Sequence, residues 1–245
     1  FLAYLAVFHF IRQQYGFIRL YSRQSKEPAW NLKTDQRMVY AFTIIPILIW
    51  HFSGPKNFNW FVENDFIYIQ NQWFKIGLQI VWYVLFVSYI VKEIWIFKHY
   101  KEWSLPRFLF MLGTAFSWFI GIVVCNGDLA FTTLNVVSHG IPYIALVWFF
   151  GVKNYQNKPS TPVLSKIFSI KYVAVFITVL ILFAYLEEGL WDGLIWRENA
   201  FIFGIFYQFP RIDETWLSFI IPLLALPQWT HYVLDGFIWK IGNNN

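Results

Sequence analysis

Charged residues are scarce in this chain, and their scarcity indicates its class. Asp, Glu, Lys and Arg make up 13% of the 245 residues, whereas an average soluble domain has about 25%. Hydrophobic residues make up 58% and aromatic residues 23%, which is typical of a helical membrane protein with aromatic belts at its interfaces. The composition therefore predicts one integral membrane domain, residues 1–245, with the lipid bilayer as its main partner.

Cysteines and the motifs of soluble enzymes are also missing. The single cysteine, Cys125, excludes an intramolecular disulfide and any CxxC metal site. The chain has no GxSxG, Walker A, GxGxxG or HExxH motif. Its five histidines are too few for the dense histidine boxes of membrane desaturases and hydroxylases. The net charge of +5 does not indicate a nucleic-acid partner, because the basic residues cluster in loops.

The start of the chain indicates that residues precede it. Position 1 is Phe, and the first apolar run has 11 residues before Arg12, too few to cross a bilayer alone. A positively charged leader followed by a small-residue cleavage site is absent, so we recognise no cleavable signal peptide. We expect further residues, or whole helices, upstream of position 1.

Hydrophobic segments predict an all-α polytopic bundle of about seven transmembrane helices. The segments are residues 1–21, 38–53, 73–97, 106–125, 129–151, 168–188 and 215–239. A shorter run, 201–209, ends at Pro210 and is expected to be re-entrant or interfacial. Fifteen of the 19 Lys and Arg residues fall in alternate loops and the tail, which the positive-inside rule places in the cytoplasm together with the C-terminus. We expect a bacterial-type inner membrane.

Two motifs place ionisable side chains inside hydrophobic segments, namely FHFIRQQYG and THYVLDGF. His9 and Gln13 are four residues apart, as are His231 and Asp235, so each pair lies on one face of a helix. Such groups cost on the order of 2.5–3.5 kcal/mol each at membrane depth. They therefore require either a partner or a function.

The predicted topology puts three histidines at one membrane depth, near the midplane or on its cytoplasmic side. They are His9, His139 and His231, whereas His51 and His99 lie at helix ends. Neutral imidazole binds Fe, Zn and Cu, and bundle cores build such sites from facing helices. The three histidines therefore predict a metal site.

Other polar residues near the histidines have expected roles at this site. Asp235 is a candidate fourth ligand, or else it accepts a hydrogen bond from His231 and fixes its tautomer. Gln13 and Asn135 are candidate hydrogen-bond partners of the other two histidines.

The same residues also have purely structural interpretations. A membrane histidine often bonds a backbone carbonyl or a neighbouring helix. Asp235 could pair with Arg12 or Arg19 near the inner interface. Arg12, Arg19 and Arg23 are expected to face lipid headgroups or the cytosol.

Three segments resemble the Brp/Blh family of membrane β-carotene dioxygenases: VFHFIRQQYG, NVVSHGIPYIALVW and ALPQWTHYVLDGFIWK. In the family these positions hold a His-Phe-Gly followed by an acid, a helix with a histidine pair, and a Pro-His followed by Asp. The chain departs from the pattern at two points. Pro227 and His231 are four residues apart instead of adjacent, and Tyr143 stands in place of the second histidine of the middle pair. Tyr143 is therefore a candidate residue beside the metal ligands, like Gln13 and Asn135. The family's Pro-His-Gly motif would lie before residue 1.

The resemblance implies a non-haem iron oxygenase whose ligands are His9, His139 and His231. Its substrate would be a lipophilic molecule, such as an isoprenoid or acyl chain, that enters from the bilayer. One alternative is an electron-transfer subunit in which two of the histidines are axial ligands of haem.

A further alternative is a non-catalytic subunit of a membrane complex, or a transporter. The histidines would then bond one helix to another. Arg12, Gln13 and Asp235 would line a path for a solute or the contact with a partner.

Overall fold

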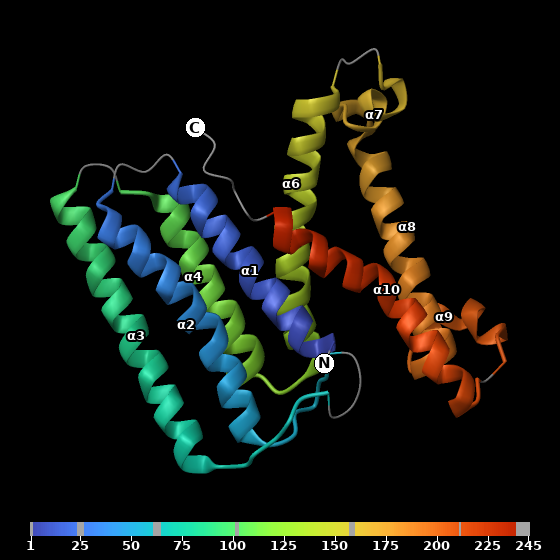
Figure 1. The fold of residues 1–245 in the computed structure, drawn as a ribbon, viewed down its shortest axis with the longest axis horizontal. Coiled ribbons are helices and arrows are strands. Elements are labelled where there is room, and N and C mark those ends of the chain that lie inside the picture. The colour runs from blue at the N-terminus through green and yellow to red at the C-terminus, as the bar shows by residue number, and fades with distance from the viewer. Residues whose placement is uncertain are drawn as a thin grey trace. The chain divides into compact units, whose positions relative to one another are not determined.

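The structure is a computed structural model that describes residues 2–23, 27–60, 65–100, 103–156, 160–210 and 212–238. For residue 214 and residues 235–238 it describes only the backbone. Within these ranges all regular elements are helices and none is a strand, as the all-α prediction requires (Figure 1).

The chain forms two compact units. Unit 1 comprises Phe1–Ile141 and Tyr232–Asn245, and unit 2 comprises Pro142–His231. The chain passes from one unit to the other within two helices, α6 (Ser138–Tyr155) and α10 (Glu214–Ile238). The chain leaves unit 1 after Ile141 and returns to it at Tyr232. Both crossing points therefore lie close in sequence to residues of the predicted metal site.

Five helical stretches are long and apolar enough to cross a membrane. They are Gln72–His99, Leu105–Val124, Asp128–Tyr155, Ile170–Trp196 and Thr215–Leu234. They match the last five predicted segments. The first two segments form α1 (Leu2–Ser22) and α2 (Ala29–Ser53), which are equally long but richer in polar residues. Seven spans and a cytoplasmic C-terminus stay predictions, and residues 239–245 lie outside the described chain.

Unit 1 is built around α1, α2, α3 (Gln72–His99) and α4 (Leu105–Phe119), which pack side by side (Figure 1). One core cluster gathers around Trp50 and Trp118, and a second around Phe42, Trp82 and Tyr89. The interior is thus largely aromatic. Burial of such large rings dominates core energetics.

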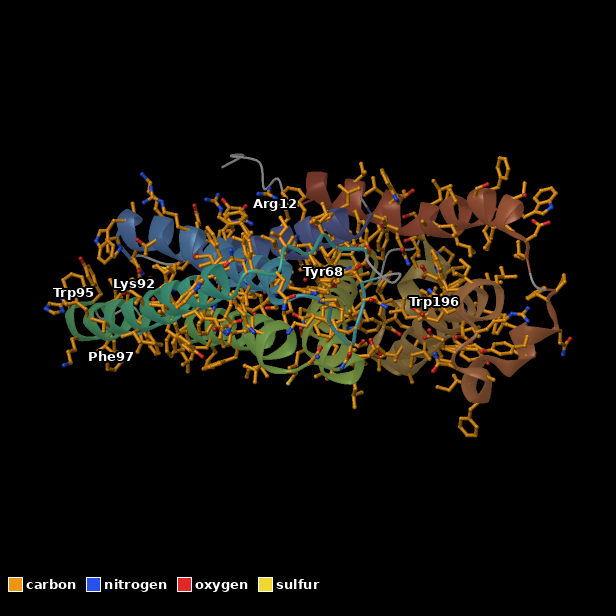
Figure 2. All side chains as sticks on the ribbon, turned by 90° about the horizontal axis from the view of Figure 1, so that it is seen from below. Arg12, Tyr68, Lys92, Trp95, Phe97 and Trp196 are labelled. Atoms are coloured by element: carbon orange, nitrogen blue, oxygen red, sulfur yellow. The ribbon has the colours of Figure 1, made fainter. Side chains whose placement is uncertain are left out.

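The outer face of α3 is apolar and exposed. Trp95 and Phe97 project from its end, as Figure 2 shows, and Val84, Val87 and Val91 are exposed along its length. A soluble protein would rarely leave so continuous an apolar face uncovered. The face therefore suits contact with lipid.

Irregular helical turns separate α4 from α6. They are η1 (Ile120–Val124), α5 (Asp128–Phe131) and η2 (Thr132–Val137), of which η1 and η2 are π-helical. Gly121 permits this packing, because a Cβ there would lie 2.4 Å from Nδ2 of Asn135. π-helical turns often occur at functional sites. The position of η2 directly before α6 and His139 therefore indicates a candidate functional site in this region.

The helices α6 and α10 are each divided between the two units. Between them, unit 2 contains six helical elements of different lengths. They are α7 (Pro162–Ile167), η3 (Ile170–Tyr172), α8 (Val173–Trp191), η4 (Asp192–Trp196), α9 (Ala200–Phe203) and η5 (Gly204–Gln208). The predicted interfacial run 201–209 forms the short elements α9 and η5 and no spanning helix. Asp192 is buried and accepts hydrogen bonds from the backbone of Glu198 and Asn199 and from the Tyr207 hydroxyl.

Candidate functional site

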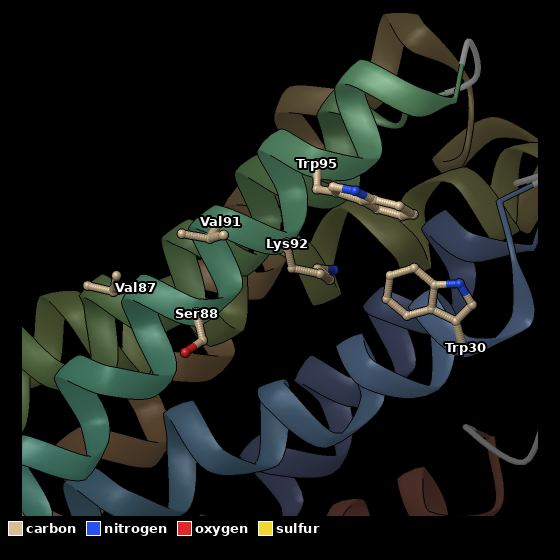
Figure 3. A pocket seen from close by; sticks show the side chains of 6 residues that line it. All are labelled: Trp30, Val87, Ser88, Val91, Lys92 and Trp95. Carbon is tan, nitrogen blue, oxygen red and sulfur yellow. The ribbon is translucent and has the colours of Figure 1, made fainter.

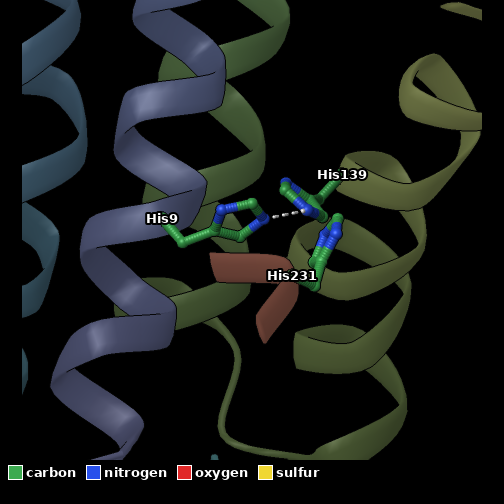
Figure 4. Close-up of side chains that lie close together, drawn as sticks. All are labelled: His9, His139 and His231. Atoms are coloured by element: carbon green, nitrogen blue, oxygen red, sulfur yellow. Dashed lines mark hydrogen bonds between the residues drawn. The ribbon is translucent and has the colours of Figure 1, made fainter. Parts of the chain in front are cut away.

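A pair of buried histidines lies in unit 1. His9 of α1 is 3% exposed and His139 of α6 is 7% exposed. Their Nε2 atoms are 3.2 Å apart, and Figure 4 shows the hydrogen bond between them as a dashed line. A hydrogen bond between two imidazoles needs one nitrogen to act as acceptor, so at least one ring is neutral. The neutral ring is also the form that binds a metal.

Aromatic rings surround the pair. The Phe10 ring stacks on His139 with centroids 3.7 Å apart and an interplanar angle of 12°. On the other side, the Tyr232 ring lies 4.8 Å from the His9 ring. Trp60 packs edge-on against Phe10. The imidazoles therefore sit in a largely apolar shell, in which electrostatic and coordinate bonds are stronger than in water.

Gln13 joins α1 to α6 beside the pair. Its side chain is fully buried, and Nε2 donates a hydrogen bond to the backbone carbonyl of His139 over 3.3 Å. The sequence predicted a bond to the His9 ring instead. Gln13 of α1 bonds the backbone of the neighbouring helix α6 and not a side chain of its own helix. The Gln13 Oε1 atom has no hydrogen-bond partner within the described ranges. A buried acceptor without a donor is costly, so the position favours a bound group that donates a hydrogen bond.

Asn135 takes a structural role. It is 2% exposed, and its Nδ2 atom donates to the carbonyl of Phe131 over 3.2 Å. The predicted bond to His139 is not formed, because the π-helical turn directs Asn135 toward Gly121. Hydropathy alone does not reveal such a turn.

The third predicted ligand ends unit 2. His231 of α10 is half-buried, and its ring meets the Tyr143 ring edge-on, with centroids 5.1 Å apart. Tyr143 thus contacts one of the three predicted ligands. Tyr232, the next residue, belongs to unit 1. The side chain of Asp235 lies outside the described residues.

The remaining predicted and excluded residues lie apart from the pair. His51 contacts Tyr4 through Nε2 over 2.9 Å and the carbonyl of Ile47 through Nδ1 over 2.7 Å. His99 bonds the carbonyl of Trp95. Both histidines thus have ordinary structural partners.

The three predicted interfacial arginines differ in environment. Arg19 and Arg23 are exposed, as residues that face lipid headgroups or cytosol would be. Arg12 is half-buried, and its Nη1 atom donates to the Tyr40 hydroxyl over 2.9 Å. Its guanidinium also lies 5.1 Å from the centre of the Tyr15 ring. Arg12 is therefore held by aromatic residues of α1 and α2.

A buried charge cluster in unit 1 was missed by the sequence analysis. Arg107 is fully buried and pairs with Glu27 at 3.0 Å, with Glu93 at 3.1 Å and with Asp35. Lys92 pairs with the same Asp35 at 2.5 Å and with Glu93. The cluster connects the starts of α2 and α4 to the end of α3. The basic pattern places Arg107 in a cytoplasmic loop and Lys92 just inside the preceding helix, and only the nearby acidic residues could have indicated that these cations are paired.

Three comparisons of the chain with known proteins found no match. No protein-family model matches it, no curated protein matches its sequence, and no solved structure matches its fold. The resemblance to the Brp/Blh family stays a prediction. A function for the chain must therefore follow from the geometry of its own residues.

Proposed function

We propose that the protein is a membrane-bound, metal-dependent oxygenase in which His9, His139 and His231 hold a non-haem iron ion. The substrate would be a lipophilic chain, such as an isoprenoid or acyl group. The observation that carries this proposal is the 3.2 Å separation of two buried imidazole nitrogens.

This separation suits two ligands of one ion. An imidazole nitrogen binds a first-row metal at about 2.0–2.1 Å, so two such ligands at a tetrahedral angle are about 3.3–3.4 Å apart. The Nε2 atoms of His9 and His139 are 3.2 Å apart. Neither side chain would need to move by more than a few tenths of an ångström to bind an ion between them.

Chain connectivity supports His231 as the third ligand. The Tyr232 ring lies 4.8 Å from the His9 ring, and both residues belong to unit 1. His231 is bonded directly to Tyr232, so it is one residue from a side chain that touches the pair. In this proposal His231 offers the third nitrogen to the ion.

The free acceptor on Gln13 supports a hydrated ion. Three histidines leave further coordination positions open, and open positions are what catalytic sites keep for water or substrate. A metal-bound water would donate a hydrogen bond to the Gln13 Oε1 atom, which has no other donor within the described chain. Iron is preferred over zinc or copper on the basis of the family resemblance.

A dioxygenase reaction fits a site of this kind. It inserts both atoms of O2 into the substrate and so needs no external reductant. The aromatic shell of Phe10, Trp60 and Tyr232 would exclude bulk water and pack against an apolar chain. The apolar helices would let the substrate enter from the bilayer.

Haem binding fits the pair less well. Two axial histidines bind iron from opposite sides, so their nitrogens would be about 4 Å apart with the macrocycle between them. The observed 3.2 Å separation is shorter, and the Phe10 ring already stacks on His139. An absorption spectrum of the purified protein distinguishes the two proposals, because only haem gives a Soret band.

Metal analysis of the purified protein tests the proposal. Protein from iron-supplemented cells is expected to contain stoichiometric iron. His9→Ala, His139→Ala and His231→Ala should each lose most of it, whereas His99→Ala, at an exposed histidine outside the group, should keep it. Wild-type protein without stoichiometric transition metal would refute the proposal. Equal metal content in all four variants would instead favour a non-catalytic subunit or transporter.

A further inference from the structure

A cationic pocket lies between α1 and α2 of unit 1. Its volume is about 320 Å³, and its lining residues are Arg12, Tyr15, Lys33, Gln36, Arg37 and Tyr40. Arg12 and Tyr15 are three residues apart on α1. On α2, Gln36 and Arg37 follow Lys33 by three and four positions and precede Tyr40 by four and three, so each group occupies one helix face.

The positive charge of this pocket is not neutralised by any side chain that the structure describes. The pocket contains Arg12, Lys33 and Arg37, and none of its described lining residues is a carboxylate. No acidic side chain of the described residues pairs with any of the three. Asp35 lies between the two cations of α2 in sequence, but its carboxylate is buried in the charge cluster with Arg107. Lys33 and Arg37 also repel each other at a spacing of four residues, so a bound anion would stabilise the helix.

Hydrogen-bond donors converge on the same pocket. One Nη1 hydrogen of Arg12 goes to the Tyr40 hydroxyl, and the remaining guanidinium hydrogens are available to a ligand. Tyr40 accepts that bond and keeps its own hydroxyl hydrogen to donate. Tyr15 and Tyr40, with ring centroids 5.5 Å apart, hold Arg12 in place. A fixed guanidinium with neighbouring cations matches the geometry of phosphate oxygens.

Another groove of unit 1 lacks this property. It has a volume of about 430 Å³ and is lined by Trp30, Val87, Ser88, Val91, Lys92 and Trp95 (Figure 3). Lys92, its one lining cation, is already paired with Asp35 and Glu93. An anion would therefore gain little there.

We propose that the pocket of Arg12, Lys33 and Arg37 binds a phosphate group. The phosphate could belong to the headgroup of an anionic membrane lipid or be free inorganic phosphate, because both present the same oxygen atoms. The site is separate from the histidine pair and does not depend on a bound metal.

Calorimetric titration in neutral detergent at low, fixed ionic strength tests this proposal. The probes are inorganic phosphate and a short-chain phosphatidic acid, with phosphatidylcholine of the same chain length as the zwitterionic control. The variant Lys33→Gln/Arg37→Gln should weaken binding by about tenfold or more, since two charge-assisted contacts are lost. Both positions are exposed, so the variant is expected to fold normally.

The matched control is Lys153→Gln/Lys166→Gln, which removes the same charge from exposed positions of unit 2 that do not line the pocket. It should change affinity less than about twofold. Binding of either probe with this contrast supports the proposal, and the probe that binds identifies the source of the phosphate. No binding of either probe, or equal weakening in both variants, would overturn it. His9→Ala should keep its phosphate affinity, so failure of the metal site would not affect this result.

Discussion

Replacing Arg107 with Met should destabilise unit 1, because it leaves three buried carboxylates without their shared cation. The Arg107 side chain is fully buried and pairs with Glu27, Asp35 and Glu93. After the substitution Lys92 would still pair with Asp35 and Glu93. Methionine fills a similar volume, so the change tests charge more than packing.

The expected loss of stability is about 3–5 kcal/mol, the usual cost of removing one partner from a buried ion pair. For a chain of this size each kcal/mol shifts the melting temperature by roughly 2–4 °C, which gives a decrease of about 6–20 °C.

Thermal unfolding of detergent-solubilised protein, followed by tryptophan fluorescence, measures this change. The control is Lys98→Met at the exposed end of α3, where a shift within about ±0.5 kcal/mol is expected. In the double variant Arg107→Met/Asp35→Asn the loss should be smaller than the sum of the two single losses by about 0.5–3 kcal/mol. If Arg107→Met and Lys98→Met have the same melting temperature, the buried ion pairs do not stabilise unit 1, and the reasoning is refuted.

Two further substitutions test local packing and pH dependence. Gly121→Ala should destabilise by about 1–3 kcal/mol, because the new Cβ would lie 2.4 Å from a buried amide nitrogen. Gly113→Ala, with open space at its Cβ, should not destabilise, and equal melting temperatures would contradict this account. In unit 2, desolvation and the hydrogen bond to Asp192 raise the pKa of Tyr207 above its usual value. The stability that this bond provides is therefore complete below about pH 10 and is lost as the pH rises through the raised pKa. Between pH 9 and 11, the free energy of unfolding of Tyr207→Phe should fall less than that of the wild type. Identical pH profiles of the two proteins would count against the bond.

The helical class and five candidate spans followed directly from hydrophobic content, because a bilayer-facing helix must be apolar along about 20 residues. Breaks within those spans did not follow. The predicted segment 129–151 contains a π-helical turn at Thr132–Val137. Hydropathy is insensitive to the hydrogen-bond register of the backbone, so it could not have placed Asn135 against Gly121.

Membrane depth brought the candidate ligands His9 and His139 to the same layer, and in the structure they are in contact. Depth could not predict which atoms meet, because that depends on the rotation of each helix about its axis. For this reason the partners of Gln13 and Asn135 were predicted incorrectly. Both residues bond backbone carbonyls, which carry no signal in the sequence.

The segment predicted at 38–53 is in fact a longer helix, α2, which begins at Ala29. Hydropathy treats residues 29–37 as a loop since they contain Lys33, Asp35 and Arg37. Successive residues of a helix are 100° apart, so Asp35 points nearly opposite to Lys33 and Arg37, its neighbours two positions away. The acid faces the buried cluster and the bases line the pocket. The charges are therefore sorted between two faces of one helix.

This sorting connects the two polar regions of unit 1. A slip of α2 by one residue would turn Asp35 by about 100° and withdraw it from Arg107 and Lys92. Withdrawal of one partner from a buried ion pair costs about 3–5 kcal/mol, whereas the mutual repulsion of Lys33 and Arg37 costs only about 0.2–0.5 kcal/mol. The buried ion pairs thus outweigh the repulsion by a wide margin. They fix the rotation of α2 and hold the two exposed cations at the pocket even when no anion is bound.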